Sequence, residues 1–113
     1  MKLSSTHVGD VAVVRVQETR LTAPILSDLA ATAAKFIQDG SSRLLIDLSP
    51  VSYVDSATIG CLMDLYRQAT AAGGILKLSG VQPRVETMLS MTGANNFLEV
   101  HSSEPAAIAS FGG

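Results

Sequence analysis

Short apolar segments of strand length alternate with longer amphipathic segments along the 113-residue sequence. Runs of apolar and β-branched residues predict strands at residues 3–8, 11–16, 44–48, 75–78 and 97–100. Apolar residues that recur every three or four positions predict helices between Thr22 and Gly40, Ser56 and Gly73, Pro83 and Gly93, and Glu104 and Phe111. A strand–helix–strand order implies parallel strands joined by crossovers. The pattern therefore predicts one α/β domain that spans residues 1–113.

The predicted sheet is mixed. Only the turn signal Gly9 and Asp10 separates the first two strands, which favours an antiparallel hairpin. The run Leu44–Leu48 is almost continuously apolar, which is typical of an internal strand covered on both faces. We expect four or five strands, with the helices packed mainly on one face of the sheet.

Composition and charge argue against several classes of partner. Charged residues make up 16% of the chain and the formal net charge is -2, so nothing attracts it to nucleic acid or to an anionic membrane. No apolar run approaches the roughly 18 residues that a membrane-spanning helix needs, and residues 1–10 lack the apolar segment of a signal peptide. The single cysteine, Cys61, cannot form an internal disulfide, which favours a cytoplasmic protein.

The sequence lacks the patterns of known catalytic and metal sites. Its two histidines, His7 and His101, lie near opposite ends, and no His or Cys pair has metal-ligand spacing. Neither the glycine loops that bind phosphate nor the nucleophile motif Gly-x-Ser-x-Gly occurs. We therefore predict a binding protein rather than an enzyme, with no metal and no cofactor.

The most informative stretch runs from Leu45 to Gly60 and reads LIDLSPVSYVDSATIG. An apolar strand ends in Asp-Leu-Ser, and a short loop leads to Asp-Ser at the start of a helix. In these features the chain resembles the STAS domain family, specifically its small bacterial anti-sigma factor antagonists, whose motif ends in Asp-Ser-Ser-Gly-Leu-Gly. The likeness continues at residues 21–23, 75–81 and 91–100, and the main departure is Thr58, where the family usually has Gly.

This resemblance implies a STAS fold and a partner-switching function. In that scheme the unmodified protein binds an anti-sigma factor, which is also a serine kinase of the GHKL type, and a sigma factor is released. The kinase phosphorylates the serine that follows the aspartate of the motif, which is Ser56 here. A serine phosphatase reverses the modification.

The position of Ser56 suits a phosphate. We expect Ser56 at the N-cap of the second helix, where unpaired N–H groups and the helix dipole favour an anion. A phosphate adds about -1.5 to -2 charge units, which would oppose a partner bound at this surface. The alternative is that Ser56 only caps the helix. Asp55 caps the helix, contacts the kinase, or does both.

The family pattern places the partner-binding surface at one end of the sheet, around the junction before the second helix. Tyr53 is either an exposed aromatic anchor or a buried packing residue, and Thr58 is expected to be half-buried. The same surface is expected to include the segment Leu21–Thr22, at the end of the hairpin. The predicted partner-binding residues are Leu21, Thr22, Tyr53, Val54, Asp55, Ser56, Ala57, Thr58, Ile59 and Gly60.

Two other functions remain compatible with such a resemblance. Some STAS-like domains are structural or assembly subunits of signalling scaffolds or lipid-transport complexes, in which the serine can be idle. Others have been proposed to bind nucleotides, which implies a small-molecule sensor.

Overall fold

The computed structural model describes residues 3–111. Within these residues, five strands and four α-helices follow the predicted order, with a short 3-10 helix before the last strand. The strands are β1 (Leu3–Val8), β2 (Val11–Val16), β3 (Arg43–Asp47), β4 (Ile75–Ser79) and β5 (Glu99–His101). The helices are α1 (Ala23–Gln38), α2 (Ser56–Ala71), α3 (Pro83–Thr92), η1 (Ala94–Asn96) and α4 (Glu104–Ser110).

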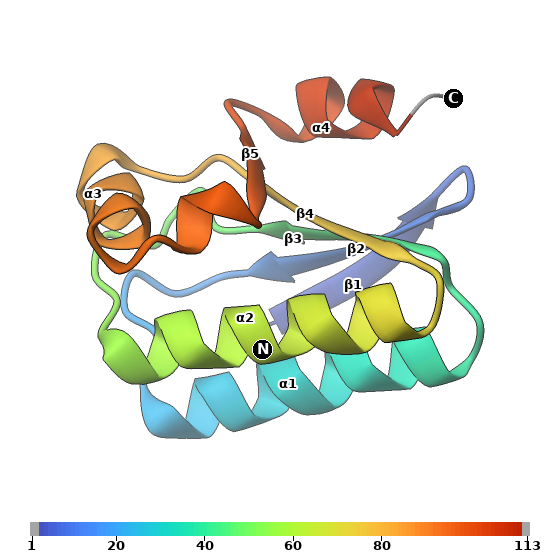
Figure 1. Cartoon of the computed structure of the whole chain (residues 1–113), viewed down its shortest axis with the longest axis horizontal. Coiled ribbons are helices and arrows are strands. Elements are labelled where there is room, and N and C mark those ends of the chain that lie inside the picture. The colour runs from blue at the N-terminus through green and yellow to red at the C-terminus, as the bar shows by residue number, and fades with distance from the viewer. Residues whose placement is uncertain (1–2, 112–113) are drawn as a thin grey trace.

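The strands form one mixed sheet in the order β1-β2-β3-β4-β5 (Figure 1). β1 and β2 form an antiparallel hairpin, whereas β2, β3, β4 and β5 are parallel neighbours. β3 is the central strand, and its residues Leu44, Leu45 and Ile46 are at most 1% exposed. The predicted mixed sheet with an internal strand 44–48 is therefore confirmed.

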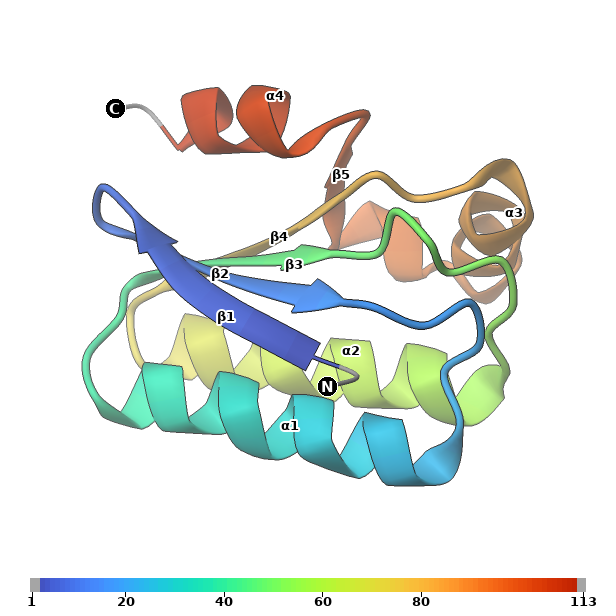
Figure 2. The same ribbon diagram turned by 180° about the vertical axis from the view of Figure 1, so that it is seen from behind.

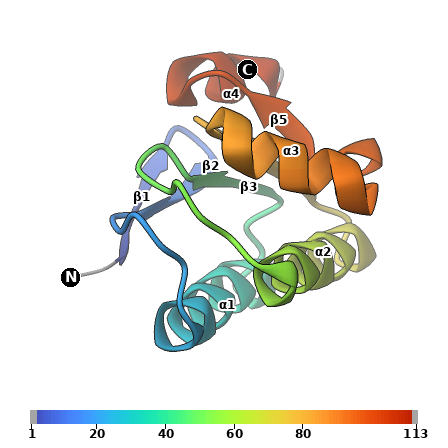
Figure 3. The same cartoon turned by 90° about the vertical axis from the view of Figure 1, so that its left-hand side faces the viewer.

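The helices cover the two faces of the sheet unequally. α1 and α2 pack side by side against one face, and α4 lies on the opposite face (Figure 3). The larger apolar cluster fills the α1–α2 side and also takes in Val85 and Leu89 of α3. The smaller cluster lies under α4 and consists of Val11, Val13, Leu45, Ala107 and Phe111. The helices thus pack mainly on one face, as predicted, and α4 covers the apolar side chains that the other face still carries.

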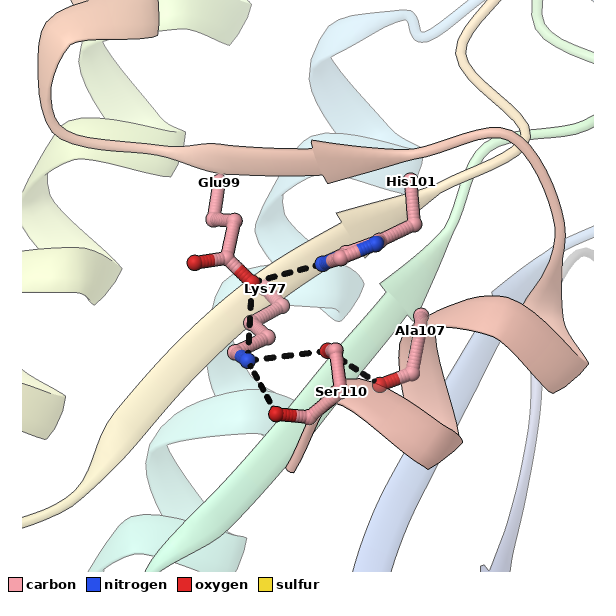
Figure 4. A network of polar contacts seen from close by, with 5 residues as sticks. All are labelled: Lys77, Glu99, His101, Ala107 and Ser110. Carbon is pink, nitrogen blue, oxygen red and sulfur yellow. Dashed lines mark hydrogen bonds and ion pairs between the residues drawn. The ribbon is translucent and has the colours of Figure 1, made fainter. Parts of the chain in front are cut away.

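Two cationic side chains of the sheet hold α4 in place. Arg15 of β2 donates two hydrogen bonds, 2.8 and 2.9 Å long, to the carboxylate of Glu104 at the start of α4. Nζ of Lys77 in β4 donates to the carbonyl oxygen and the hydroxyl of Ser110, at 3.0 and 2.8 Å (Figure 4). Lys77 also pairs with Glu99 at 2.7 Å. These partners offset the cost of burying the Lys77 ammonium group.

Two details differ from the sequence prediction. The last strand is Glu99–His101 rather than residues 97–100, because the chain first winds into η1 and leaves Phe97 at the end of that turn, 56% exposed. In α2, the spacing of apolar residues predicts a buried stripe of Ile59, Leu62, Met63, Tyr66 and Ala69. In the structure Leu65 is buried, whereas Met63 and Tyr66 are only partly buried. The helix therefore faces the sheet through a side rotated slightly from the predicted stripe.

Candidate functional site

Two loops meet at the edge where the parallel strands end (Figure 3). The loop after β2 contacts the loop after β3, and the backbone N–H of Ser52 donates to the carbonyl of Thr19 over 2.8 Å. One residue further along, Arg20 and Tyr53 form an isolated parallel bridge. The carboxyl ends of neighbouring parallel strands lie side by side, which is why segments so far apart in sequence come together here.

A polar brace around Asp47 fixes the start of the loop after β3. Oδ1 of Asp47 accepts hydrogen bonds from the hydroxyls of Ser49 at 2.7 Å and Ser79 at 2.9 Å. Gly80 follows with a φ of +68°, and a Cβ at this position would collide with Oγ of Ser49. The side-chain amide of Gln82 donates to the carbonyl of Ser49 over 2.8 Å. The ends of β3 and β4 therefore hold together the loop that leads into α2.

Asp55 is the N-cap of α2, and Ser56 is the first helical residue. Oδ1 of Asp55 accepts hydrogen bonds from the backbone N–H of Thr58 at 3.0 Å and from its hydroxyl at 3.1 Å. These bonds, the backbone one above all, hold the pKa of the Asp55 carboxyl below its ordinary value. The prediction that Ser56 caps the helix is therefore wrong, because the carboxylate of Asp55 already satisfies the N–H of the first turn.

Thr58 belongs to the core rather than to the half-buried surface predicted for it, because its exposed fraction is 0%. Its hydroxyl donates to Asp55, so its burial leaves no polar group without a partner. The threonine that stands where the family usually has glycine thus adds a second hydrogen bond to the cap.

Ser56 is exposed at the start of a 16-residue helix. Its hydroxyl makes no hydrogen bond to any other residue in the described range 3–111. The first turn of α2 contains no acidic residue, so no carboxylate within the helix opposes an anion there. The helix dipole favours negative charge at this end. The end of the helix therefore favours a negative charge at Ser56, although the carboxylate of the cap residue Asp55 lies next to it.

The predicted partner-binding residues as a whole divide into an exposed and a buried group. Thr22, Tyr53, Asp55, Ser56, Ala57 and Gly60 are exposed. Leu21, Val54, Thr58 and Ile59 are at most 5% exposed and pack into the core beneath them.

The segment Leu21–Thr22 does not lie at the hairpin end, because the hairpin turn at Gly9 and Asp10 is at the opposite end of β2. The bridge between Arg20 and Tyr53 nevertheless brings this segment to the predicted surface.

Arg20 is a residue of this surface that the sequence did not predict. Its guanidinium carbon lies 5.0 Å from the ring centroid of Tyr53, which is itself 43% exposed. A cation–π contact at an exposed site contributes roughly 0.5–1 kcal/mol, so the pair orients the ring without burying it. No local pattern marks Arg20, because its partner comes from another loop.

A shallow recess continues the same surface toward α1. It is lined by Glu18, Thr19, Arg20, Thr22, Pro24, Ile25 and Asp28. Among residues 3–111, no group of three or more His, Cys, Asp and Glu residues is placed to hold a metal ion. No helix in this range is both long and apolar enough to cross a membrane.

Comparison with known families agrees with this geometry. A family model described as "Mlab, STAS domain" matches residues 4–99. The chain belongs to the STAS domain family. The resemblance noted in the sequence is thereby confirmed.

Relatives of this STAS domain are named as anti-sigma factor antagonists. One, from Thermotoga neapolitana, is 26% identical over 74 residues, which cover 66% of each chain, so the present chain spans about two thirds of its length. The crystal structure of a protein so named from Thermotoga maritima superimposes with a TM-score of 0.85 at 19% identity, covering 96% of this chain and 92% of that one. The Bacillus cell fate determinant SpoIIAA in its phosphorylated form gives 0.77 at 18% identity, covering 96% and 98%. At these identities the two structures show the shared fold.

Replacing Asp55 tests the cap of α2. Asp55→Ala removes the acceptor of both Thr58 hydrogen bonds, so we expect a clearly lower Tm. Asp55→Asn keeps an acceptor but loses the charge, and should retain more of the stability. Thermal unfolding followed by circular dichroism measures both effects.

The same pair of variants gives a pH test. The folded-state pKa of Asp55 is lowered, so its carboxylate stabilises the domain above the unfolded pKa. That contribution is lost as pH falls through the folded pKa. The acid-induced drop in Tm should therefore be smaller in Asp55→Asn than in the wild type. Identical pH profiles would argue against a charged cap.

Proposed function

We propose that this STAS domain is an anti-sigma factor antagonist controlled by phosphorylation. Unmodified, it binds an anti-sigma factor that is a serine kinase of the GHKL type, and a sigma factor is released. Phosphate on Ser56 ends that binding, and a serine phosphatase restores it. The protein acts in the cytoplasm by binding rather than by catalysis.

The observation that carries this proposal is the position of Ser56. It follows the cap residue Asp55, its side chain is exposed, and it starts a long helix whose dipole favours an anion. It also occupies the place in the motif that the family uses as phosphoacceptor. The names of the relatives and the solved phosphorylated form of SpoIIAA support the same conclusion.

The exposure of each side chain indicates which residues contact the partner. We assign them to the exposed group Thr22, Tyr53, Asp55, Ser56, Ala57 and Gly60. The buried group Leu21, Val54, Thr58 and Ile59 shapes this surface from beneath. Tyr53 is the aromatic anchor, because its ring is exposed and Arg20 restricts its orientation. Aromatic residues are enriched among the side chains that dominate binding energy.

Phosphate acts on the partner more than on the fold. The added dianion would lie next to the Asp55 carboxylate, whose lowered pKa keeps it charged. A partner that covers both groups must remove water from the two negative charges of the phosphate and the one of Asp55, or its contact with this surface is lost. Each 1.4 kcal/mol of that penalty weakens binding about tenfold.

A second candidate function is that of an assembly subunit, such as those of signalling scaffolds or lipid-transport complexes. One observation favours it, since the description of the matching family model, "Mlab, STAS domain", does not name an anti-sigma factor antagonist. In that role the exposed surface around Ser56 would bind its partner constitutively.

Mass spectrometry distinguishes the two candidates. The protein is incubated with ATP and the GHKL-type kinase encoded nearest to its gene, beside a Ser56→Ala control. We expect one phosphate, on Ser56, and none on the control. Phosphate on another residue would refute the site, and a stable complex with transport components that is indifferent to the Ser56 variant would support the assembly role.

A further inference from the structure

The two edge strands of the sheet, β1 and β5, differ in how well they are protected from pairing with another chain. β5 is only three residues long, carries the acidic Glu99, and lies next to η1 and α4. Short length, charged side chains and neighbouring elements are the usual means of protecting an edge strand from pairing with another chain. The β5 edge is therefore poorly suited to pairing with a further strand.

The β1 edge lacks these protections. β1 is six residues long and pairs with β2 without a bulge, from Leu3 opposite Val16 to Val8 opposite Val11. Its sequence, LSSTHV, contains no Pro, Asp, Glu, Lys or Arg. Within the described range 3–111, its backbone makes no hydrogen bond outside the hairpin ladder. Figure 2 shows β1 in front, at the outer side of the sheet.

We propose that β1 pairs with β1 of a second copy of this chain. The two strands run antiparallel across a two-fold axis perpendicular to the sheet, and the five-stranded sheets join into one continuous sheet. This inference does not depend on the function proposed for Ser56, because the surface around that residue lies at the ends of the parallel strands.

The faces of β1 set the register of this pairing. Leu3 belongs to the core on the α1 side, and the ring of His7 meets Phe36 of α1 edge to face, with centroids 5.4 Å apart. Odd-numbered residues of β1 thus face α1. Opposite residues of an antiparallel pair point to the same face. An odd residue must therefore face an odd residue. The register that pairs all three odd residues of β1 with odd residues of the second copy sets Ser5 opposite the partner's Ser5 and Leu3 opposite the partner's His7.

The charges beside the proposed β1–β1 contact, called the seam below, favour a second copy of this chain as the partner. Ser5 lines a shallow recess together with Thr32, Lys35, Phe36 and Asp39 of α1. The two-fold axis sets the two α1 helices antiparallel, so Lys35 of one copy lies on the side of the partner's Asp39. The seam is thus complementary in charge, while β1 itself adds no charge that would repel its copy.

Sedimentation equilibrium of the full chain tests the proposal. We expect the apparent mass to rise with concentration from 11.8 kDa toward twice that value. Ser5→Lys and Ser5→Glu each place two like charges on the axis, and each should weaken self-association at least about tenfold. An equimolar mixture of the two variants pairs opposite charges at the same point and should restore the dimer.

Ser90→Lys serves as the control, because Ser90 is an exposed serine of α3 and far from β1 in the sheet order. It should dimerise like the wild type, and circular dichroism should show that all variants are folded. A wild type that stays monomeric at every concentration would overturn the proposal. So would a Ser5→Lys variant that still dimerises, or a mixture that stays monomeric.

Discussion

A phosphate on Ser56 is expected to weaken binding to the anti-sigma kinase about 100-fold, which corresponds to ~2.7 kcal/mol. A partner that covers the phosphate and the charged carboxylate of Asp55 beside it must remove water from both groups, and desolvating each buried ion costs several kcal/mol. Isothermal titration calorimetry on the phosphorylated and unmodified forms measures this difference. Equal affinity of the two forms would contradict the switch even if Ser56 were the modified residue.

Variants of Ser56 separate the charge from the loss of the hydroxyl. Because Asp55 is the cap, Ser56→Ala should change stability by no more than about 0.5 kcal/mol and should bind the partner without accepting phosphate. Ser56→Glu should also fold, since a carboxylate is favourable in the first turn of a helix. It should bind more weakly than the wild type but more tightly than the phosphorylated form, because it carries about one negative charge rather than nearly two.

A matched control excludes a general effect of added charge. Ser42 is an exposed serine just before β3, at the opposite end of the strands from α2's first turn. Ser42→Glu should leave the affinity unchanged. If it weakened binding as much as Ser56→Glu, the effect would come from net charge rather than from the surface around Ser56.

The largest effect on stability is expected for Gly80→Ala, at about 2–5 kcal/mol. The φ of +68° at Gly80 is strained for a residue with a Cβ, and the added carbon would meet Oγ of Ser49 and lie 3.0 Å from Oδ1 of Asp47. Left-handed strain costs roughly 1–2 kcal/mol, and overpacking typically adds 1–3 kcal/mol. Urea unfolding of the variant measures the sum.

Gly9→Ala provides the matched comparison. Gly9 has a similar φ of +63°, but a Cβ there would meet nothing within 4 Å. Gly9→Ala should lower the free energy of unfolding by about 1–2 kcal/mol, from backbone strain alone. The excess at Gly80 then measures how tightly the ends of β3 and β4 enclose the loop that leads to Ser56. An equal decrease in the free energy of unfolding for the two variants would show that the residues around Asp47 can shift to accommodate the added carbon.

The sequence by itself determined the order and type of the elements and the position of the central strand. Each of these features depends on the pattern of apolar residues that are close together in sequence. The apolar run at 44–48, for example, had to be covered on both faces wherever the helices lay. The Asp-Ser step before α2 could likewise be located from its motif, because a cap is a local feature. The final strand begins two residues later and ends one residue later than predicted, because the short turn of η1 has no periodic signal.

Only the tertiary structure decided which of the two residues at that step is the cap, and what surrounds it. The choice of Asp55 over Ser56 depends on the side-chain position that lets one carboxylate accept both Thr58 hydrogen bonds. The contact of Arg20 with Tyr53 and the brace around Asp47 join loops that are distant in sequence. The same holds for Lys77, whose partners come from β5 and α4. Such contacts follow from strand order and register, which bring together residues that no local pattern connects.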